Sequence, residues 1–291
     1  MKAQFAELFH QDYQQVFTIE DMLYQGKTAY QDIAFFQNAV FGRIMILDTV
    51  VQTTEKDEFI YHEMFAHVPI LSHGSVKNVL IIGGGDGGLL REVCKHREIS
   101  SITMVELDEQ VIELSKKYLP NHSNGSFDDK RVNLIIGDGI DYVANCQQHF
   151  DLILSDSTDP IGPGEVLFSE HFYTSCLNCL TDDGILVTQN GVAALQVQSI
   201  AQSYQRLIKK FADVAAYRAD VPTYVGGDMH FMWASQQTQH RQHSLSIIEK
   251  RYQASGIETH YYDPDLHLAS FALPRYVKLA MQGELQLTEN T

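Results

Sequence analysis

Short, almost wholly apolar runs alternate with helix-like stretches from residue 77 onward, and this alternation constrains the fold more than any other feature. A run that is apolar at nearly every position is typical of a strand buried on both faces of a parallel sheet. Strand–helix alternation with short connections predicts a doubly wound α/β sheet. The expected strands, seven with the last two included, span residues 78–82, 101–105, 132–136, 151–154, 184–188, 214–217 and 230–234.

The N-terminal quarter of the chain has a different character. Its apolar segments are short, rich in β-branched and aromatic residues, and separated by turn residues, as in a small β-rich unit. Thr54-Glu-Lys-Asp57 has the spacing of a capping box and predicts that a helix begins there. We therefore expect a β-rich domain with a connecting helix over residues 1–75, followed by a Rossmann-like catalytic domain over residues 76–291. The expected N-terminal strands span residues 31–37, 43–47 and 50–53.

Charge and hydropathy exclude several classes of protein. The chain has 21 basic and 37 acidic residues, a net charge of −16, which argues against nucleic acid as a partner. The same charge favours solubility and attracts cationic substrates. No apolar run approaches the length of about 18 residues that a membrane-spanning helix needs, and the N-terminus lacks the pattern of a signal peptide. We expect a cytoplasmic protein with no membrane partner.

Two motifs that superficially resemble metal sites have simpler interpretations. Cys176 and Cys179 form a C-x-x-C pair, but no second pair completes a zinc site, so we expect two small apolar residues on one helix face. His62 and His67 are five residues apart, which on a helix does not place both rings on one face. We predict no bound metal and no cofactor.

The predicted sheet places acidic residues at a single edge. Ligands of open parallel sheets bind beyond the carboxyl ends of the strands. The first strand runs into a glycine-rich loop over residues 83–88, where the backbone can approach a ligand closely. Glu106 ends the second strand, twenty residues beyond Asp86, a spacing at which an acid binds ribose hydroxyls. Asp138 and Asp156 follow the third and fourth strands.

These acids favour a cationic nucleotide over a dinucleotide. Asp86 would repel a pyrophosphate held at the glycine-rich loop, whereas a positively charged adenosyl sulfonium compound would be attracted. Asp156 and Asp159 leave room for a second cation, so the residues point to a sulfonium-dependent transferase with an amine acceptor. Three alternatives stay open: a methyltransferase using S-adenosylmethionine, a non-catalytic polyamine sensor and an oxidoreductase. The methyltransferase leaves the Asp156–Asp159 pair unexplained, the sensor does not need Asp156, and Asp86 argues against the oxidoreductase.

Six short motifs stand in register along the chain: 30–32 (YQD), 51–64 (VQTTE…DEF…YHEM), 83–88 (GGGDGG), 156–163 (DSTDPIGP), 222–224 (PTY) and 272–274 (ALP). They resemble those of spermidine synthases, and the bacterial members are the most similar. The resemblance extends from about residue 17 to about residue 279. Tyr224 is followed by Val225 and, three residues later, Asp228, where bacterial relatives have a second tyrosine and an apolar residue.

The resemblance implies a fold of the S-adenosylmethionine-dependent methyltransferase type and an aminopropyltransferase. The donor is decarboxylated S-adenosylmethionine, the acceptor is putrescine, and the products are spermidine and 5′-methylthioadenosine. A homodimer or homotetramer, assembled through the N-terminal unit, is also implied.

The resemblance also assigns roles to individual residues. Asp156 would be the general base, and a loop over residues 156–170 would close over the adenine. The donor would be bound by Gln31, Gln52, Gly83, Gly85, Asp86, Glu106, Asp138, Gly139 and Pro163. The amine would be bound by Tyr61, His62, Asp86, Asp156, Ser157, Thr158, Asp159 and Tyr224.

Overall fold

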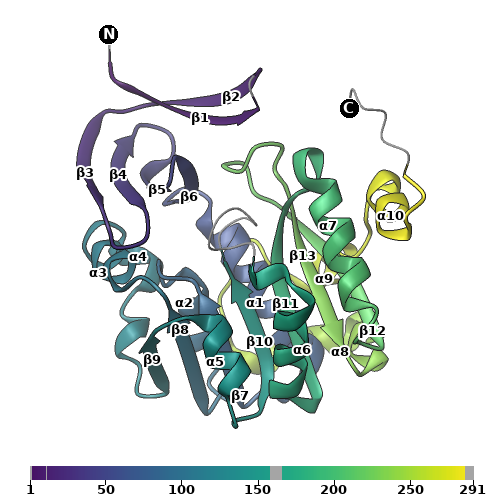
Figure 1. Cartoon of the computed structure of the whole chain (residues 1–291). Coiled ribbons are helices and arrows are strands. Elements are labelled where there is room, and N and C mark those ends of the chain that lie inside the picture. The colour runs from purple at the N-terminus through teal and green to yellow at the C-terminus, as the bar shows by residue number, and fades with distance from the viewer. Residues whose placement is uncertain (1, 11, 158–165, 286–291) are drawn as a thin grey trace.

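The computed structural model describes residues 2–10, 12–157 and 166–285 of the chain. A β-rich N-terminal region is followed by a seven-stranded sheet with helices on both faces (Figure 1), as predicted from the sequence. No helix in the described ranges combines the length and the apolar character needed to cross a bilayer.

The N-terminal region consists of an antiparallel hairpin and a four-stranded antiparallel sheet. The three strands expected there are confirmed as β4, β5 and β6, and three more strands precede them. Side chains of β4 alternate between two cores: Ile33 and Phe35 pack with Val111, whereas Phe36 packs with Phe17 of the hairpin. The hairpin is β1 (Gln4–His10) and β2 (Tyr13–Thr18); the sheet is β3 (Asp21–Lys27), β4 (Asp32–Asn38), β5 (Gly42–Leu47) and β6 (Val50–Thr54).

Helix α1 (Glu58–His73) connects this region to the large sheet. The predicted capping box is wrong: Asp57 is the N-cap residue, and its side chain does not cap the helix. The Asp57 carboxylate instead accepts hydrogen bonds from the Thr223 backbone N–H at 2.7 Å and from the Thr54 hydroxyl at 2.7 Å. The Asp57 carboxylate, which the local sequence pattern predicted to cap the helix, is thus used in a contact with Thr223, a residue distant in the sequence. The domain boundary after residue 75 stays a prediction.

The large sheet has the strand order β12-β13-β11-β10-β7-β8-β9. Neighbouring strands from β11 to β9 are parallel, whereas β13 runs antiparallel to β11 and β12. The chain moves outward from β7 in one direction and then, from β10, in the other, so the order reverses between β7 and β10. The strands are β7 (Asn78–Gly83), β8 (Ser101–Glu106), β9 (Val132–Ile136), β10 (Phe150–Asp156), β11 (Leu180–Val192), β12 (Asp213–Asp220) and β13 (Asp228–Ser235).

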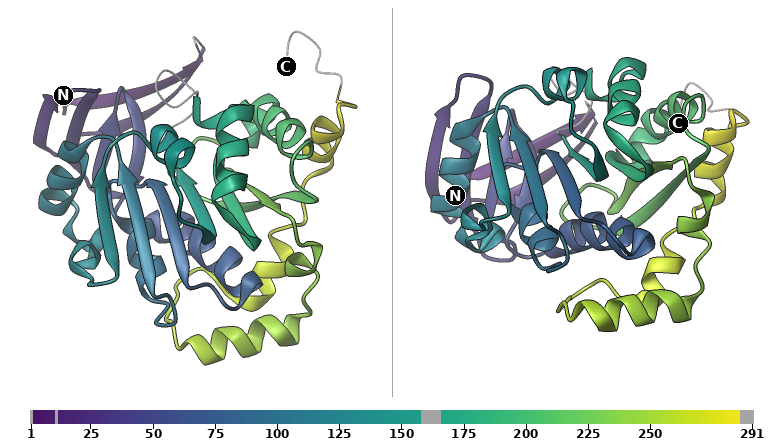
Figure 2. Two further views of the ribbon diagram at one scale, coloured as in Figure 1. Left: turned by 60° about the horizontal axis from the view of Figure 1, so that its bottom comes forward. Right: turned by 90° about the horizontal axis from the view of Figure 1, so that it is seen from below.

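The helices cover both faces of this sheet, as Figure 2 shows. Val79 and Ile81 of β7 belong to the core that includes α1 and α2, whereas Leu80 and Ile82 belong to the core that includes α5, α6 and α7. This alternation is what the two-residue period of a strand requires when both faces are buried. The helices after α1 are α2 (Gly88–Cys94), α3 (Glu109–Tyr118), α4 (Pro120–Ser123), α5 (Gly139–Asn145), α6 (Glu170–Cys179), α7 (Ala193–Leu207), α8 (Leu245–Ser255), α9 (Pro264–Ala269) and α10 (Arg275–Gln282).

All seven strands predicted for the large sheet are present, but two differ from expectation. Strand β9 is not buried on both faces: it is the edge strand, and Ile136 is 44% exposed. An edge strand has only one neighbour, so an apolar sequence alone does not establish burial. Strand β11 spans Leu180–Val192 and extends beyond both ends of the expected strand over residues 184–188.

Candidate active site

The glycine-rich loop and Asp156 meet at the point where the strand order reverses. Asp156 at the end of β10 lies opposite Gly83 at the end of β7, and the Gly84 N–H donates to the Asp156 carbonyl at 3.1 Å. Gly83 has φ +80°, and a Cβ there would lie 2.1 Å from that carbonyl oxygen. A Cβ on Gly84 would lie 3.1 Å from the Asp156 carboxylate. Only glycine permits this close contact, and ligands of such sheets bind at this reversal.

Asp156 is held by a tyrosine from helix α1. The Tyr61 hydroxyl donates to Asp156 Oδ1 at 2.6 Å. Burial raises the pKa of Asp156, the charge of His62 lowers it and that of Asp86 raises it, leaving the pKa at about 6. The Tyr61 ring packs edge-on against Tyr224, at 5.9 Å between centroids, and the Tyr224 hydroxyl donates to the Gln52 carbonyl at 2.8 Å.

His62 lies between two carboxylates. Its Nδ1 is 2.6 Å from Glu58 Oε2, and its Nε2 is 3.6 Å from Asp86 Oδ2. Burial lowers the pKa of His62, but the charges of Asp86 and Glu58 raise it more, to about 9. The ring is therefore an imidazolium at neutral pH. Asp86 also accepts a hydrogen bond from the Gly88 N–H at 2.8 Å, which fixes its carboxylate at the start of α2.

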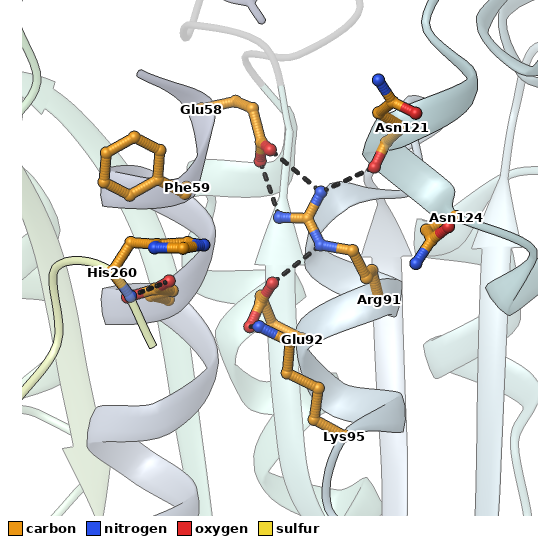
Figure 3. Close-up of a pocket in the computed structure, with 9 residues that line it drawn as sticks. Glu58, Phe59, Arg91, Glu92, Lys95, Asn121, Asn124 and His260 are labelled. Atoms are coloured by element: carbon orange, nitrogen blue, oxygen red, sulfur yellow. Dashed lines mark hydrogen bonds and ion pairs between the residues drawn. The ribbon is translucent and has the colours of Figure 1, made fainter. Parts of the chain in front are cut away.

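An arginine holds Glu58, the partner of His62, in place, and Figure 3 shows the contact between Arg91 and Glu58. Both terminal nitrogens of Arg91 donate to the Glu58 carboxylate, each at 2.9 Å, and its Nε donates to Glu92 at 2.7 Å. Burial raises the pKa of Glu58, but His62 and Arg91 lower it by more, and the resulting pKa is about 2. These side chains line a charged pocket of about 350 Å³. Sequence reasoning missed Glu58 and Arg91, although the four-residue spacing of Glu58 and His62 on a helix was a usable signal.

A second group of polar residues surrounds Glu106. Its carboxylate accepts from the Asp108 N–H at 2.9 Å, and Gln31 donates to the Asp108 carboxylate at 3.2 Å. A Cβ on Gly85 would lie 3.1 Å from Glu106 Oε2, so this carboxylate also contacts the glycine-rich loop. Burial raises the pKa of Glu106 to about 7, although the Asp108 N–H lowers it. The sequence did not single out Asp108, which also caps α3 by accepting from the Gln110 N–H.

The structure brings together most, but not all, of the predicted site residues. Asp138 is exposed at the start of α5, where its carboxylate accepts from the Ile140 N–H at 2.7 Å. Gly139 lies against Ile82, since a Cβ there would be 2.4 Å from Ile82 Cγ2. The Ser157 carbonyl accepts from Gln189 at 2.8 Å. The remaining predicted residues, Thr158, Asp159 and Pro163, lie outside the described residues, as does most of the predicted loop.

The two motifs that superficially resemble metal sites have the following surroundings. Cys176 and Cys179 are buried free cysteines on α6, in agreement with the sequence analysis. His62 and His67 have separate partners: His67 contacts Glu92 at 3.0 Å and His96 at 3.0 Å.

Comparisons with known proteins agree with this arrangement. Residues 58–244 match the spermine/spermidine synthase domain, and residues 5–55 match the spermidine synthase tetramerisation domain. The polyamine aminopropyltransferase 1 of Pseudomonas aeruginosa is 53% identical over 277 residues, 95% of this chain and 97% of the relative. The polyamine aminopropyltransferase of Pectobacterium carotovorum is 52% identical over 277 residues, 95% of this chain and 96% of the relative.

Solved structures give the same result. A spermidine synthase in complex with the transition state analogue AdoDATO is similar with a TM-score of 0.91 and 36% identity, covering 96% of this chain and 95% of that chain. The spermidine synthase from Thermotoga maritima is similar with a TM-score of 0.88 and 34% identity, covering 96% of this chain and 94% of that chain. The chain therefore belongs to the spermidine synthase family of aminopropyltransferases, which are transferases of polyamine biosynthesis.

Proposed function

We propose that this protein transfers the aminopropyl group of decarboxylated S-adenosylmethionine to putrescine, giving spermidine and 5′-methylthioadenosine, with Asp156 as the general base. The observation that carries the proposal is the Asp156 carboxylate: it stands at the end of a central strand, accepts from the Tyr61 hydroxyl at 2.6 Å and interacts with the charges of His62 and Asp86.

The proposed chemistry is a direct displacement. The attacking amine is an ammonium in water, with a pKa near ~10, so it must lose a proton to react. A carboxylate with a pKa of about 6, as Asp156 has, is ionised at neutral pH and can first bind the ammonium and then take its proton. The freed nitrogen attacks the carbon beside the sulfonium, and the carbon–sulfur bond breaks with its electron pair going to sulfur. The sulfonium is already a good leaving group, so the reaction needs no metal or other cofactor.

Positioning supplies most of the acceleration in this proposal, since nitrogen, carbon and sulfur must lie in line. The donor lies against the backbone of Gly83 and Gly85, with its ribose hydroxyls on Glu106 and its amine on Asp86. Support for the ribose role comes from Glu106, which is buried next to the glycine-rich loop and adjoins Asp108. Gln31 and Gln52 complete the donor side, while Asp138, Gly139 and Pro163 form the adenine side.

The amine side of the proposed site consists of Tyr61, His62 and Tyr224 together with Asp156. Ser157, Thr158 and Asp159 follow Asp156 and hold the incoming cation. At the unusual positions of the Tyr224 segment, Val225 is buried and the Asp228 carboxylate accepts from Arg218 at 2.7 Å. Asp228 is thus already paired with a cation.

One assay with product detection by mass spectrometry tests the proposal. The purified protein is offered both sulfonium donors with putrescine, cadaverine, spermidine and butylamine. We expect aminopropyl transfer from the decarboxylated donor, with putrescine preferred and with a large loss for butylamine, which lacks the second cation. Methyl transfer, or butylamine turnover equal to that of putrescine, would contradict the proposal.

We further propose that the N-terminal region assembles the protein into a dimer or tetramer. The match to a tetramerisation domain supports this proposal. The β1–β2 hairpin, at the edge of the molecule in Figure 1, also exposes apolar side chains that a partner would cover: Leu8 is 64% and Val16 is 48% exposed. Light scattering after gel filtration measures the mass, and a monomer would refute the proposal.

A further inference from the structure

Two histidines and one aspartate converge at the end of the sheet opposite the candidate active site. His73 is the last residue of α1, Asp183 lies near the start of β11, and His240 is in the 3₁₀ helix η3 (Thr238–Arg241). His73 is eleven residues beyond His62 on the same helix, which corresponds to about 16 Å at 1.5 Å per residue. Within the described part of the chain, only these residues form a group of three with metal-ligating side-chain atoms close together.

The three ligating atoms have nearly the separations that a metal ion imposes. His73 Nε2 is 3.6 Å from Asp183 Oδ2, His240 Nε2 is 3.0 Å from Asp183 Oδ1, and all three atoms lie within 4.8 Å of one another. Tetrahedral Zn²⁺ with ligands at about 2.0–2.1 Å separates its ligand atoms by roughly 3.3 Å. Small side-chain rotations therefore suffice to close the group around an ion.

His73 carries an unsatisfied polar atom that faces this group. Its side chain is 3% exposed, yet its Nε2 has no hydrogen-bond partner. Its Nδ1 accepts from the Ser75 backbone N–H at 3.3 Å, which places the ring proton on Nε2 when no ion is bound. An ion at Nε2 requires that proton to move to Nδ1, where the Ser75 hydroxyl at 3.2 Å can accept it. A buried polar atom without a partner is costly, and a metal ion that replaces the Nε2 proton would satisfy it. Metal-binding histidines commonly have such an outer hydrogen bond, which orients the ring.

The two imidazole rings lie side by side in this group. They lie 5.0 Å apart between centroids with 15° between their planes, and His240 Nε2 is also 3.0 Å from the Asp183 backbone carbonyl. Asp183 is 52% exposed and gives an ion access from solvent, whereas both imidazoles are buried. The nearby cation Arg251 is directed elsewhere, because its Nη1 donates to the carbonyls of Leu71 and Ser72 at 2.7 and 2.5 Å.

We propose that His73, Asp183 and His240 bind one divalent first-row transition-metal ion, with Zn²⁺ as the best-suited ion. Two imidazoles and a carboxylate are a common ligand set for such ions, and water takes the remaining position. The ion joins the end of α1, the start of β11 and η3, so its role is to stabilise the fold. The proposed aminopropyl transfer does not involve it.

Binding is tested on the untagged, metal-free protein with Zn²⁺ and Co²⁺ as probes. Elemental analysis after dialysis measures stoichiometry, thermal unfolding measures stabilisation, and the visible spectrum of Co²⁺ reports its coordination. The variants are Asp183→Asn and His240→Ala, and His171→Ala, an exposed histidine on α6, is the matched control. We expect one Zn²⁺ per chain and a rise in Tm of roughly 5 °C or more at a concentration about 100-fold above Kd.

The variants decide between a site and non-specific binding to surface histidines. Both site variants should lose the Zn²⁺-dependent rise in Tm and the Co²⁺ spectrum, while His171→Ala retains them. Aminopropyl transfer by Asp183→Asn should equal that of the wild type, which shows that this variant is folded. Absence of Zn²⁺ binding by the wild type at micromolar concentration would overturn the proposal. Binding of Zn²⁺ by Asp183→Asn and His240→Ala as tight as that of the wild type would also overturn it.

Discussion

Replacing Asp156 by Asn should make the ligand-free protein more stable while it slows turnover strongly. The folded state raises the pKa of this carboxyl from 3.8 to about 6, since burial disfavours its charge. A carboxyl whose pKa is raised by folding stabilises the protein at low pH, where it is protonated. That stability is lost as the pH rises from about 4 through about 6. At neutral pH the ionised Asp156 therefore opposes folding.

The size of this effect follows from the shift. One pKa unit corresponds to about 1.4 kcal/mol, so the two pKa values give a cost of about 3 kcal/mol at pH 8 and about 1.6 kcal/mol at pH 5. These are upper limits, because Asp156 is half-buried and keeps some contact with solvent. The uncharged amide that Asp156→Asn introduces does not bear this cost, and its oxygen can still accept from the Tyr61 hydroxyl.

Thermal and urea unfolding of the two proteins at pH 5 and pH 8 measure the difference. Asp156→Asn should unfold several degrees higher than the wild type at pH 8, with a smaller difference at pH 5. Its turnover should fall by about 10²–10⁴, the usual cost of losing a general base. Asp265→Asn, which changes an exposed carboxylate on α9, is the control. An Asp156→Asn protein that is less stable at both pH values, or as active as the wild type, would refute the reasoning.

Three further outcomes are expected. Asp86→Asn should reduce the preference for the decarboxylated donor. In the wild type, repulsion between Asp86 and the extra carboxylate of S-adenosylmethionine costs about 4 kcal/mol at 4 Å and an effective dielectric of 20. Equal wild-type kcat/KM for the two donors would contradict this. In the wild type the acid limb of the kcat/KM profile should lie near pH 6, where Asp156 titrates. The Tyr61 hydroxyl lowers the pKa of Asp156, so Tyr61→Phe should raise that pKa and move the limb to higher pH. A limb that does not move would exclude Asp156 as the group that titrates there. Glu58→Gln should lower the pKa of His62 from about 9, and an unchanged midpoint in an NMR titration of that ring would rule out the proposed contact.

The strands were predictable because their signal is local. An apolar run needs no knowledge of its partners, so the residues at the strand ends, among them Glu106 and Asp156, could be placed at one edge from the sequence alone. Burial of a particular run depends on its neighbours, which is why β9 was wrongly expected to be covered on both faces. Strands β1 to β3 are largely exposed and alternate weakly, so their sequence carried less signal.

The pairs within the site were less predictable than its members. The Asp57–Thr223 and Gln31–Asp108 hydrogen bonds join residues 166 and 77 positions apart. Such contacts depend on how α1 and β4 pack on the large sheet, and no local pattern encodes that packing. The Glu58–His62 pair differs, because its partners are one helical turn apart. It could have been found by asking which acid lies four residues before the histidine.

The charges of the assembled site explain why a cationic ligand suits it. Arg91 already neutralises Glu58, so His62 is the cation left to balance the carboxylates of Asp86 and Asp156. A raised pKa on Asp156 in spite of the imidazolium shows that the positive charge does not fully compensate for burial and for Asp86. A bound ammonium would supply the missing positive charge and thereby lower the pKa of Asp156. By linkage, the cation therefore binds more tightly when the Asp156 carboxyl is ionised than when it is protonated. The same imbalance that opposes folding of the free protein thus favours binding of a polyamine.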